Sequence, residues 1–248
     1  MAKVGIIGGS GLDNPKLLQA AIETDVETPY GKPSSLPTVG KIEGVDVVII
    51  SRHGKEHQFS PTQVNFRANI HALKELGATH IVATTACGSL REEIGRGDFV
   101  LMDQFIDFTK HRINTFHESF EKEAVHTPMA APFDAELRKI VYNTSAELGY
   151  TTHNGGTMVT IEGPRFSTRA ESNMFRMWGA DVINMSTATE VALANEAGIP
   201  YVGIAMSTDY DCWKVDEAPV SWDEILEVFN KNAGNVIQLI KKSIPKIL

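Results

Sequence analysis

Two carboxylic acids stand at the end of one apolar segment in the last quarter of the sequence. Asp209 and Asp211 follow the run Tyr201–Met206 and precede Cys212 and Trp213. A carboxyl group buried among such neighbours has a raised pKa and can donate a proton near neutral pH. That property suits a general acid for a nitrogen leaving group. A pair of solvated loop acids, or a helix N-cap, is the alternative that these residues leave open.

Four other apolar runs end in residues that can bind an anion. They are followed by Gly8-Gly9-Ser10-Gly11, Ser51-Arg52-His53-Gly54, Thr84-Thr85-Ala86-Cys87-Gly88-Ser89 and Asn184-Met185-Ser186-Thr187. Glycines let backbone N–H groups approach an oxyanion, and a guanidinium group matches two phosphate oxygens. Because ligands of α/β sheets collect outside the carboxyl ends of strands, we expect these segments to form one phosphate-sized site.

The same segments contain partial matches to three better-known motifs. A dinucleotide fingerprint needs a third glycine near Asn14, and a Walker loop needs a following Gly-Lys-Ser/Thr; the sequence has neither. The string His53-Gly54-Lys55-Glu56-His57 matches the H-x-x-E-H pattern of some zinc peptidases. That chemistry requires both histidines on one face of a helix. Because Gly54 follows a strand and the next helix start is expected at Ser60, a loop is favoured over a zinc site.

The elements that must position these residues follow from the hydrophobic pattern. Strands are expected at Val4–Ile7, Val45–Ile50, Ile81–Thr85, Phe99–Met102, Met158–Ile161, Val182–Met185 and Tyr201–Met206. Helices are expected from Ser60 to Gly77, Asp134 to Gly149, Thr168 to Trp178, Glu190 to Ala197 and Ser221 to about Lys242. Strands that alternate with helices predict an α/β fold, with a largely parallel sheet covered on both faces.

Composition limits the classes of function. The chain has 248 residues, 42% of them hydrophobic, and a formal net charge of -8, so we expect a single domain over residues 1–248. The acidic surplus disfavours nucleic-acid binding, and no run approaches the ~18 apolar residues that cross a membrane. Two cysteines, Cys87 and Cys212, cannot form a disulfide framework, which favours a cytoplasmic location. The irregular stretch from Thr109 to Pro132 is expected to be a functional excursion within that domain.

The motifs, taken in order, resemble those of 5′-methylthioadenosine phosphorylases, within the trimeric purine nucleoside phosphorylase family. The segments that carry the resemblance are Gly8–Leu12, Ser51–Gly54, Thr84–Leu90, Glu162–Phe166 and Asp209–Trp213, and the match runs from about Val4 to Ser243. The resemblance implies a three-layer α/β/α fold with a central, largely parallel or mixed twisted sheet. It also implies a homotrimer, inorganic phosphate as co-substrate, and neither a cofactor nor a metal.

The resemblance further assigns roles to individual residues. It implies that phosphate is bound by Ser10, Arg52, His53, Thr85, Ala86 and Ser186. It implies that the nucleoside is bound by Met185 at the ribose, Phe166 beside the base, Asp209 at N7, Tyr210, and Asp211 at the 6-amino group. Asp209 is also the expected catalytic acid. Specificity is assigned to Ser167, Trp222, Ile225, Leu226 and, from a neighbouring subunit, His126.

These assignments predict reversible phosphorolysis of 5′-methylthioadenosine to adenine and 5-methylthioribose 1-phosphate, as part of purine and methionine salvage. Two carboxyl groups favour a 6-amino base, because an acceptor oxygen pairs with an amine and repels a carbonyl. Trp222 stands where the family commonly has a smaller aliphatic residue, so the size of the accepted 5′ group stays open. The alternatives are a broader or 6-oxopurine nucleoside phosphorylase, a zinc-dependent hydrolase and a non-catalytic nucleoside-binding protein.

Overall fold

The computed structural model describes residues 3–8, 17–120, 123–216 and 221–247, except for the side chains of Trp222 and Glu224. Its strands are β1 (Lys3–Gly8), β2 (Gln19–Glu23), β3 (Thr38–Ile42), β4 (Val45–Ser51), β5 (His80–Ser89), β6 (Phe99–Leu101), β7 (Gln104–Phe108), β8 (Thr152–Asn154), β9 (Thr157–Ile161), β10 (Val182–Asn184) and β11 (Tyr201–Asp209). Its helices are α1 (Phe66–Glu75), α2 (Ala135–Glu147), α3 (Arg169–Met177), α4 (Thr187–Glu196), α5 (Trp222–Ser243) and the 3-10 turn η2 (Ile244–Lys246).

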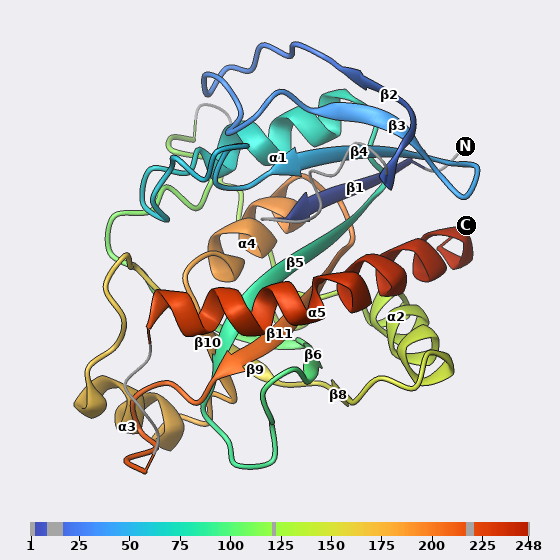
Figure 1. The fold of residues 1–248 in the computed structure, drawn as a ribbon. Coiled ribbons are helices and arrows are strands. Elements are labelled where there is room, and N and C mark those ends of the chain that lie inside the picture. Colours follow the sequence, from blue (N-terminus) through green and yellow to red (C-terminus); the bar gives the residue numbers. More distant parts are fainter. Residues whose placement is uncertain (1–2, 9–16, 121–122, 217–220, 248) are drawn as a thin grey trace.

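The strands form one mixed sheet that lies between two layers of helices (Figure 1). Because side chains alternate along a strand, β4 directs Val48 and Ile50 toward the core that contains α1 and α4. It directs Val47 and Ile49 toward the opposite core, which contains α2 and α5. A third, smaller cluster packs α3 against β9 and β10. The three-layer α/β/α arrangement with a mixed sheet is confirmed.

Strand β5 is the centre of the sheet and the point at which it forks. One edge of β5 pairs with β1 over His80–Ala83 and then with β10 at Gly88–Ser89. The other edge pairs with β11 almost throughout, from Ile81 to Gly88. Within the described chain, the segment Thr84–Cys87 therefore has a strand partner on one edge only. The open edge is available to side chains and to a ligand.

All seven predicted runs are strands in the structure, while β2, β3, β7 and β8 were not predicted. The missed strands lack the apolar runs used to find the others: all five residues of β2 are exposed, and β8 is Thr-His-Asn. They lie toward the margins of the sheet, where β2 and β7 end the main strand order and β8 pairs only with β6. Hydrophobic patterning thus identified the covered centre of the sheet and not its rim.

The helix predicted to start at Ser60 starts instead at Phe66, and that prediction was wrong. Ser60 to Gln63 form a single turn, closed by a 2.9 Å bond from the Gln63 N–H to the Ser60 carbonyl. The true N-cap is Asn65, whose side chain accepts a hydrogen bond from the Ala68 N–H. A capping-box pattern can therefore occur in a single turn that is not followed by a helix. Similarly, α4 starts at Thr187, three residues before the predicted Glu190.

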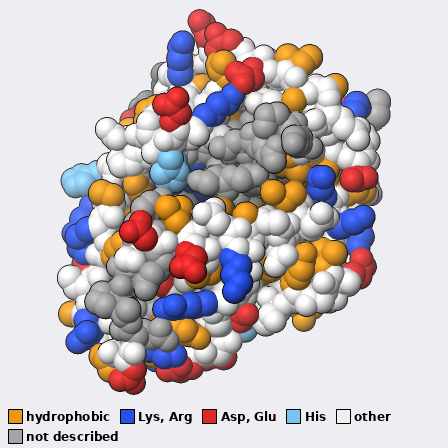
Figure 2. Space-filling view, viewed as in Figure 1, with side chains coloured by type: hydrophobic (Ala, Val, Ile, Leu, Met, Phe, Trp, Pro, Cys, Tyr) orange, Lys and Arg blue, Asp and Glu red, His pale blue; other side chains and the backbone are white. Residues whose placement is uncertain are grey.

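The excursion from Thr109 to Pro132 has neither helix nor strand in its described part. Among the helices that the structure describes, none is both long and apolar enough to cross a membrane. On the face drawn in Figure 2, basic and acidic side chains are interspersed across the surface. The described residues drawn on this face form no continuous basic surface of the kind that nucleic acids bind.

Candidate active site

A cavity of about 620 Å³ opens where β4, β5, β10 and β11 end. Arg52 and Asp209, whose proximity the predicted chemistry requires, line this one cavity. The end formed by Arg52, His53, Thr84–Ala86 and Ser186 is called the arginine end below. The end formed by Asp209, Asp211 and Ser167 is called the carboxylate end.

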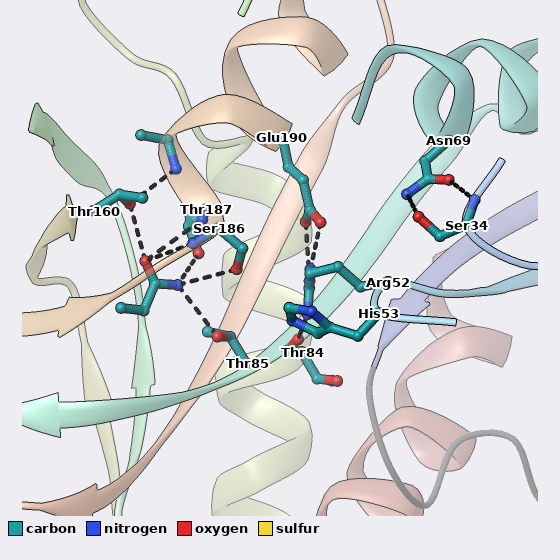
Figure 3. A network of polar contacts seen from close by, with 12 residues as sticks. Ser34, Arg52, His53, Asn69, Thr84, Thr85, Thr160, Ser186, Thr187 and Glu190 are labelled. Atoms are coloured by element: carbon teal, nitrogen blue, oxygen red, sulfur yellow. Dashed lines mark hydrogen bonds and ion pairs between the residues drawn. The ribbon is translucent and has the colours of Figure 1, made fainter. Parts of the chain in front are cut away.

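The arginine end is built around a buried ion pair. Arg52 is 3% exposed, and its guanidinium group forms a two-pronged contact with Glu190 of α4, which is 1% exposed. A third bond of 2.8 Å runs from Arg52 Nη1 to the Thr84 carbonyl on the open edge of β5. Tyr201 donates its hydroxyl to Glu190 Oε2 at 2.9 Å. Figure 3 shows Arg52 between Glu190 and Thr84, with His53 beside it.

This pairing fixes both the charge and the direction of the guanidinium group. Burial alone would lower the pKa of Arg52, but the Glu190 carboxylate raises it, so Arg52 stays charged. A guanidinium group has five N–H donors, and the bonds to Glu190 and Thr84 occupy three of them. The remaining two are available to an anion in the cavity, while Glu190 balances the positive charge.

Asn184 holds the hydroxyl groups that complete the arginine end. It accepts a 2.9 Å bond from the Thr160 hydroxyl and donates to Thr187 Oγ1 at 2.6 Å and to Thr85 Oγ1 at 3.2 Å. Ser186 is the N-cap residue of α4 but makes no side-chain cap bond. Its hydroxyl can therefore donate to a ligand at the positive end of a helix dipole. Ser186, Thr187, Thr85 and Thr160 are drawn together in Figure 3.

The main chain of β5 adds a donor to the same end. N–H and C=O groups of alternate residues face the same edge of a strand. Thr84 offers its carbonyl to Arg52, so the N–H of Ala86, two residues on, faces the same open edge. Residues Thr84–Ser89 were predicted to lie at the end of a strand over Ile81–Thr85; in the structure they belong to β5, which continues to Ser89.

The histidines of the H-x-x-E-H string lie in a loop after β4 and not on a helix. Their rings stack with centroids 4.6 Å apart, and both Gly54 and His57 have positive φ angles. His53 Nδ1 lies 2.8 Å from the Phe59 carbonyl oxygen. In the part of the chain that the structure describes, no group of three or more His, Cys, Asp or Glu side chains is arranged to hold a metal. The one-turn spacing on a helix that the zinc hypothesis needs is not formed.

The carboxylate end is shaped by an irregularity in β11. The pairing of β11 with β5 shifts register between Ser207 and Asp209, as at β-bulges beside active sites. Asp209 accepts bonds of 2.8 Å from the Thr208 hydroxyl and from the Asp211 N–H. Burial raises the pKa of Asp209 to about 6, although these hydrogen bonds oppose the increase. The predicted raised pKa is thus present in the structure.

Asp211 is buried next to Asp209 and faces a hydroxyl group. Ser167 Oγ lies 2.7 Å from both oxygens of Asp211, and burial raises the pKa of this carboxyl group. Gly88 permits the close approach of β5, because a Cβ at that position would lie 2.9 Å from Asp209 Oδ1. A larger residue at position 88 would therefore require the Asp209 side chain or its neighbours to shift.

Trp213 fixes the turn that carries both carboxyl groups. Its indole N–H donates to the Ser89 carbonyl at 2.8 Å, and the Arg176 guanidinium lies 3.7 Å above the ring. The turn is therefore attached to the end of β5 and to α3. This anchoring explains why Asp209 and Asp211 keep a defined position at a strand end, where loop acids would be solvated.

An apolar wall closes the cavity between its two ends. Ile225, Leu226 and Phe229 of α5 line it, and Ile225 is 8% exposed. Met185 and Phe166 line the same space from other segments. The cavity thus combines an anion-binding end, an end with two buried carboxyl groups and an apolar side.

Comparison with known proteins identifies the family. The model of the family described as "Phosphorylase superfamily" matches residues 3–245. The chain belongs to the phosphorylase superfamily. It is 55% identical to S-methyl-5'-thioadenosine phosphorylase of Xenopus tropicalis over 99% of this chain and 89% of that protein. It is 51% identical to the enzyme of the same name from Thermococcus kodakarensis, over 100% of this chain and 93% of that protein.

Solved structures of the superfamily give the same result. A methylthioadenosine phosphorylase from Schistosoma mansoni in complex with adenine superposes with a TM-score of 0.95 at 43% identity, covering 100% of this chain and 92% of that chain. A variant described as an adenosine/methylthioadenosine phosphorylase from the same organism, in complex with methylthioadenosine, gives a TM-score of 0.94 at 42% identity. Its comparison covers 100% of this chain and 92% of that one.

Twelve of the predicted site residues line the cavity of this superfamily member. At and near the arginine end they are Arg52, His53, Thr85, Ala86, Met185 and Ser186. Toward the carboxylate end and the apolar wall they are Phe166, Ser167, Asp209, Asp211, Ile225 and Leu226. Six segments that are distant in the sequence therefore meet in one place.

Four predicted residues are not placed in the cavity by the described part of the chain. Tyr210 turns its ring toward Trp213 and the Lys214 ammonium group. His126 is exposed, with its ring against Phe120. Ser10 and the side chain of Trp222 lie outside the described residues.

Glu190 and Tyr201 support the site of this superfamily member and were not predicted as site residues, whereas Asn184 was expected as part of the anion-binding segment Asn184-Met185-Ser186-Thr187. Glu190 was expected only as the start of a helix, and Tyr201 only as a strand residue. Arg52 and Glu190 are 138 positions apart, so no local spacing connects them. The available signal was the position of Glu190 one turn into a short, apolar helix, where a carboxylate without a partner would be costly.

Proposed function

We propose that this chain catalyses the reversible phosphorolysis of S-methyl-5'-thioadenosine to adenine and 5-methylthioribose 1-phosphate. The observation that carries the proposal is the single cavity with Arg52 at one end and a buried, high-pKa Asp209 at the other. The curated relatives at 46% to 55% identity that bear the name S-methyl-5'-thioadenosine phosphorylase support it.

In the proposed reaction, inorganic phosphate is bound at the arginine end, by Arg52, His53, Thr85, Ala86 and Ser186. It attacks the anomeric carbon of the ribose while the bond from that carbon to N9 of adenine breaks. The sugar passes through an oxocarbenium-like state, which the phosphate beneath it stabilises. Arg52, which Glu190 holds in position, keeps the phosphate in place without reorganising during the reaction.

The electron pair of the broken bond goes to the purine, and the proposed role of Asp209 is to neutralise it. A protonated Asp209 donates to N7 as the leaving base becomes negative, which is general acid catalysis. Asp211 accepts from the 6-amino group of adenine, and Ser167 orients Asp211 through its hydroxyl. Met185 and Phe166 contact the ribose and the base.

The apolar wall is the proposed site of the 5′-methylthio group. Ile225, Leu226 and Phe229 offer that group van der Waals contact, whereas a 5′-hydroxyl group would lack a hydrogen-bond partner there. Adenosine is a second candidate substrate, because a similar Schistosoma mansoni enzyme is described as an adenosine/methylthioadenosine phosphorylase. Trp222 at the start of α5 belongs to the same proposed specificity set.

The proposal includes a cytoplasmic homotrimer without a cofactor. His126 supports an assembled site, because it is exposed on the excursion and lies away from the cavity of its own chain. In a trimer it would contribute to the cavity of a neighbouring subunit. Light scattering should give three times the mass of the chain, and a monomeric mass for the active enzyme would contradict this part.

The deciding experiment measures adenine release from methylthioadenosine with and without phosphate. Release that depends on phosphate and yields a sugar 1-phosphate supports the proposal. Release in phosphate-free buffer would instead indicate a hydrolase, and binding without release would indicate a nucleoside-binding protein. Adenosine, inosine and methylthioinosine, tested in parallel, distinguish this enzyme from a broader or 6-oxopurine phosphorylase.

A further inference from the structure

The proton on His53 can be assigned from its neighbours. Its Nδ1 atom lies 2.8 Å from the Phe59 carbonyl oxygen. A carbonyl oxygen only accepts hydrogen bonds, so Nδ1 must carry the hydrogen. In a neutral imidazole ring the other nitrogen, Nε2, then has a lone pair and can only accept.

The surroundings of His53 keep the ring neutral. Burial and the adjacent Arg52 guanidinium group lower the pKa of His53 to about 4, against the opposing bond to Phe59. His57, stacked on the ring, and Arg112 act in the same direction as Arg52. The charged and titratable groups around the ring are thus cationic or potentially cationic, and each of them disfavours a second proton on His53.

The accepting nitrogen faces an unusual environment. His53 is half-buried, lines the cavity next to Arg52, and its Nε2 has no hydrogen-bond partner among the described residues. A lone pair beside an oxyanion is repulsive unless the oxyanion itself supplies a hydrogen. Glu190 balances the charge of Arg52. Excess positive charge at Arg52 therefore does not offset the repulsion between the Nε2 lone pair and the oxyanion.

We propose that His53 is a hydrogen-bond acceptor that selects protonated oxyanions, so that the site binds phosphate and arsenate and discriminates against sulfate. Phosphate and arsenate carry at least one O–H group near neutral pH, while sulfate carries none. The inference rests on the proposed function in one respect, namely that phosphate is the co-substrate. It adds a specificity role for His53 that a simple donor would not have.

The same contact orients the phosphate. With its O–H directed to His53, the unprotonated oxygens face the free N–H groups of Arg52, the Ser186 hydroxyl and the sugar. The nucleophile is then an oxygen that needs no deprotonation before it attacks. His53 holds this orientation and transfers no proton.

Calorimetric titration of the nucleoside-free protein with each anion at pH 7.5 tests the inference independently of catalysis. An unpaired acceptor costs enough that sulfate should bind at least about tenfold more weakly than phosphate and arsenate. In His53→Gln the carboxamide group can rotate to offer an N–H to sulfate. The dissociation constants for sulfate and phosphate should then differ by no more than about threefold. His57→Gln, which changes the neighbouring ring, should keep the ratio of the unchanged protein.

Equal binding of the three anions by the unchanged protein would overturn the inference, as would an unchanged ratio in His53→Gln. A matching loss of selectivity in His57→Gln would assign selectivity to the loop and overturn it too. Nitrogen NMR of the phosphate-bound protein provides a readout that needs no variant: Nε2 should appear unprotonated, and an imidazolium signal contradicts the inference. If anions are discriminated as expected but adenine is not released with phosphate, the proposed function fails while the role of His53 stands.

Discussion

At the arginine end of the cavity, the polar side chains are bonded to one another before any ligand arrives, whereas at the carboxylate end the acids are buried with raised pKa values. Arg52 makes three bonds to Glu190 and Thr84, and Asn184 links Thr85 to α4. Asp209, by contrast, is held by two bonds from residues one and two positions away in the sequence, and burial raises its pKa to about 6. One end is arranged for binding and the other for proton donation.

The difference shows two uses of burial. At the arginine end, two opposite charges are buried together, and Arg52 keeps its charge because Glu190 raises its pKa. At the carboxylate end, two like charges are buried close together, and burial favours the neutral acid. A stable anion site and a reactive acid therefore arise within 620 Å³ from the same low-dielectric environment.

The largest expected effect concerns the buried ion pair. Glu190→Ala leaves Arg52 charged and unpaired in the core and should reduce the free energy of unfolding by about 3–5 kcal/mol. Urea denaturation followed by circular dichroism measures this. The control is Glu147→Ala, which breaks an exposed contact with Lys246 and should barely move the midpoint. Similar midpoints for the two variants would show that the arginine end does not depend on its ion pair.

Replacing the acid tests the other end. Asp209→Asn keeps the size of the side chain but removes the proton that neutralises the base, so kcat for phosphorolysis should fall at least tenfold and by up to about 10⁴-fold. Steady-state kinetics with methylthioadenosine gives the value, and a circular dichroism spectrum checks the fold. Asp25→Asn, at an exposed aspartate, is the matched control and should retain full activity. Unchanged turnover in Asp209→Asn removes this residue from the role of acid.

The raised pKa of Asp209 predicts a pH dependence of the same reaction. The protonated form is the donor; it is present below pH 6 and is lost above it, because the folded-state pKa is about 6. The value of kcat/KM should therefore decline by about tenfold per pH unit well above pH 6. His53, with a pKa of about 4, adds no change in this range. The value of kcat/KM is measured from pH 5 to 8.5. The assignment is contradicted if kcat/KM does not change with pH, or if Asp209→Asn shows the same decline as the unchanged protein.

The smallest expected effect lies at the apolar wall between the two ends. Leu226→Ala removes contact with the 5′-methylthio group and should lower the preference for methylthioadenosine over adenosine by about tenfold. The ratio of kcat/KM for the two nucleosides measures it. Val228→Ala, on the same helix but outside the cavity lining, should leave the ratio unchanged. Equal effects of both substitutions would mean that α5 acts through its stability and not through contact.

The comparison of the two ends also explains what could be predicted from the sequence. Covered strands have apolar runs that are easy to detect, and the polar residues at the ends of those runs were expected to form the site, so Arg52, Thr85 and Asp209 were found. Glu190 was missed because a carboxylate in a helix ordinarily faces solvent, and its partner is distant in sequence. The start of α1 was misplaced because Ser60 and Gln63 satisfy a capping pattern within a single turn.

The forked pairing of β5 has a consequence for how such a site changes through mutation. Between Thr84 and Cys87 the strand offers main-chain groups to the cavity, and main-chain groups survive every substitution except proline. Side-chain substitutions on β5 therefore leave this main-chain part of the arginine end in place. The carboxylate end and the apolar wall, in contrast, are formed mainly by side chains, including those on α5 and on the turn after β11, and each of these can be replaced alone. In the proposed reaction, single substitutions would therefore change the accepted nucleoside more readily than they would remove the backbone part of the phosphate site.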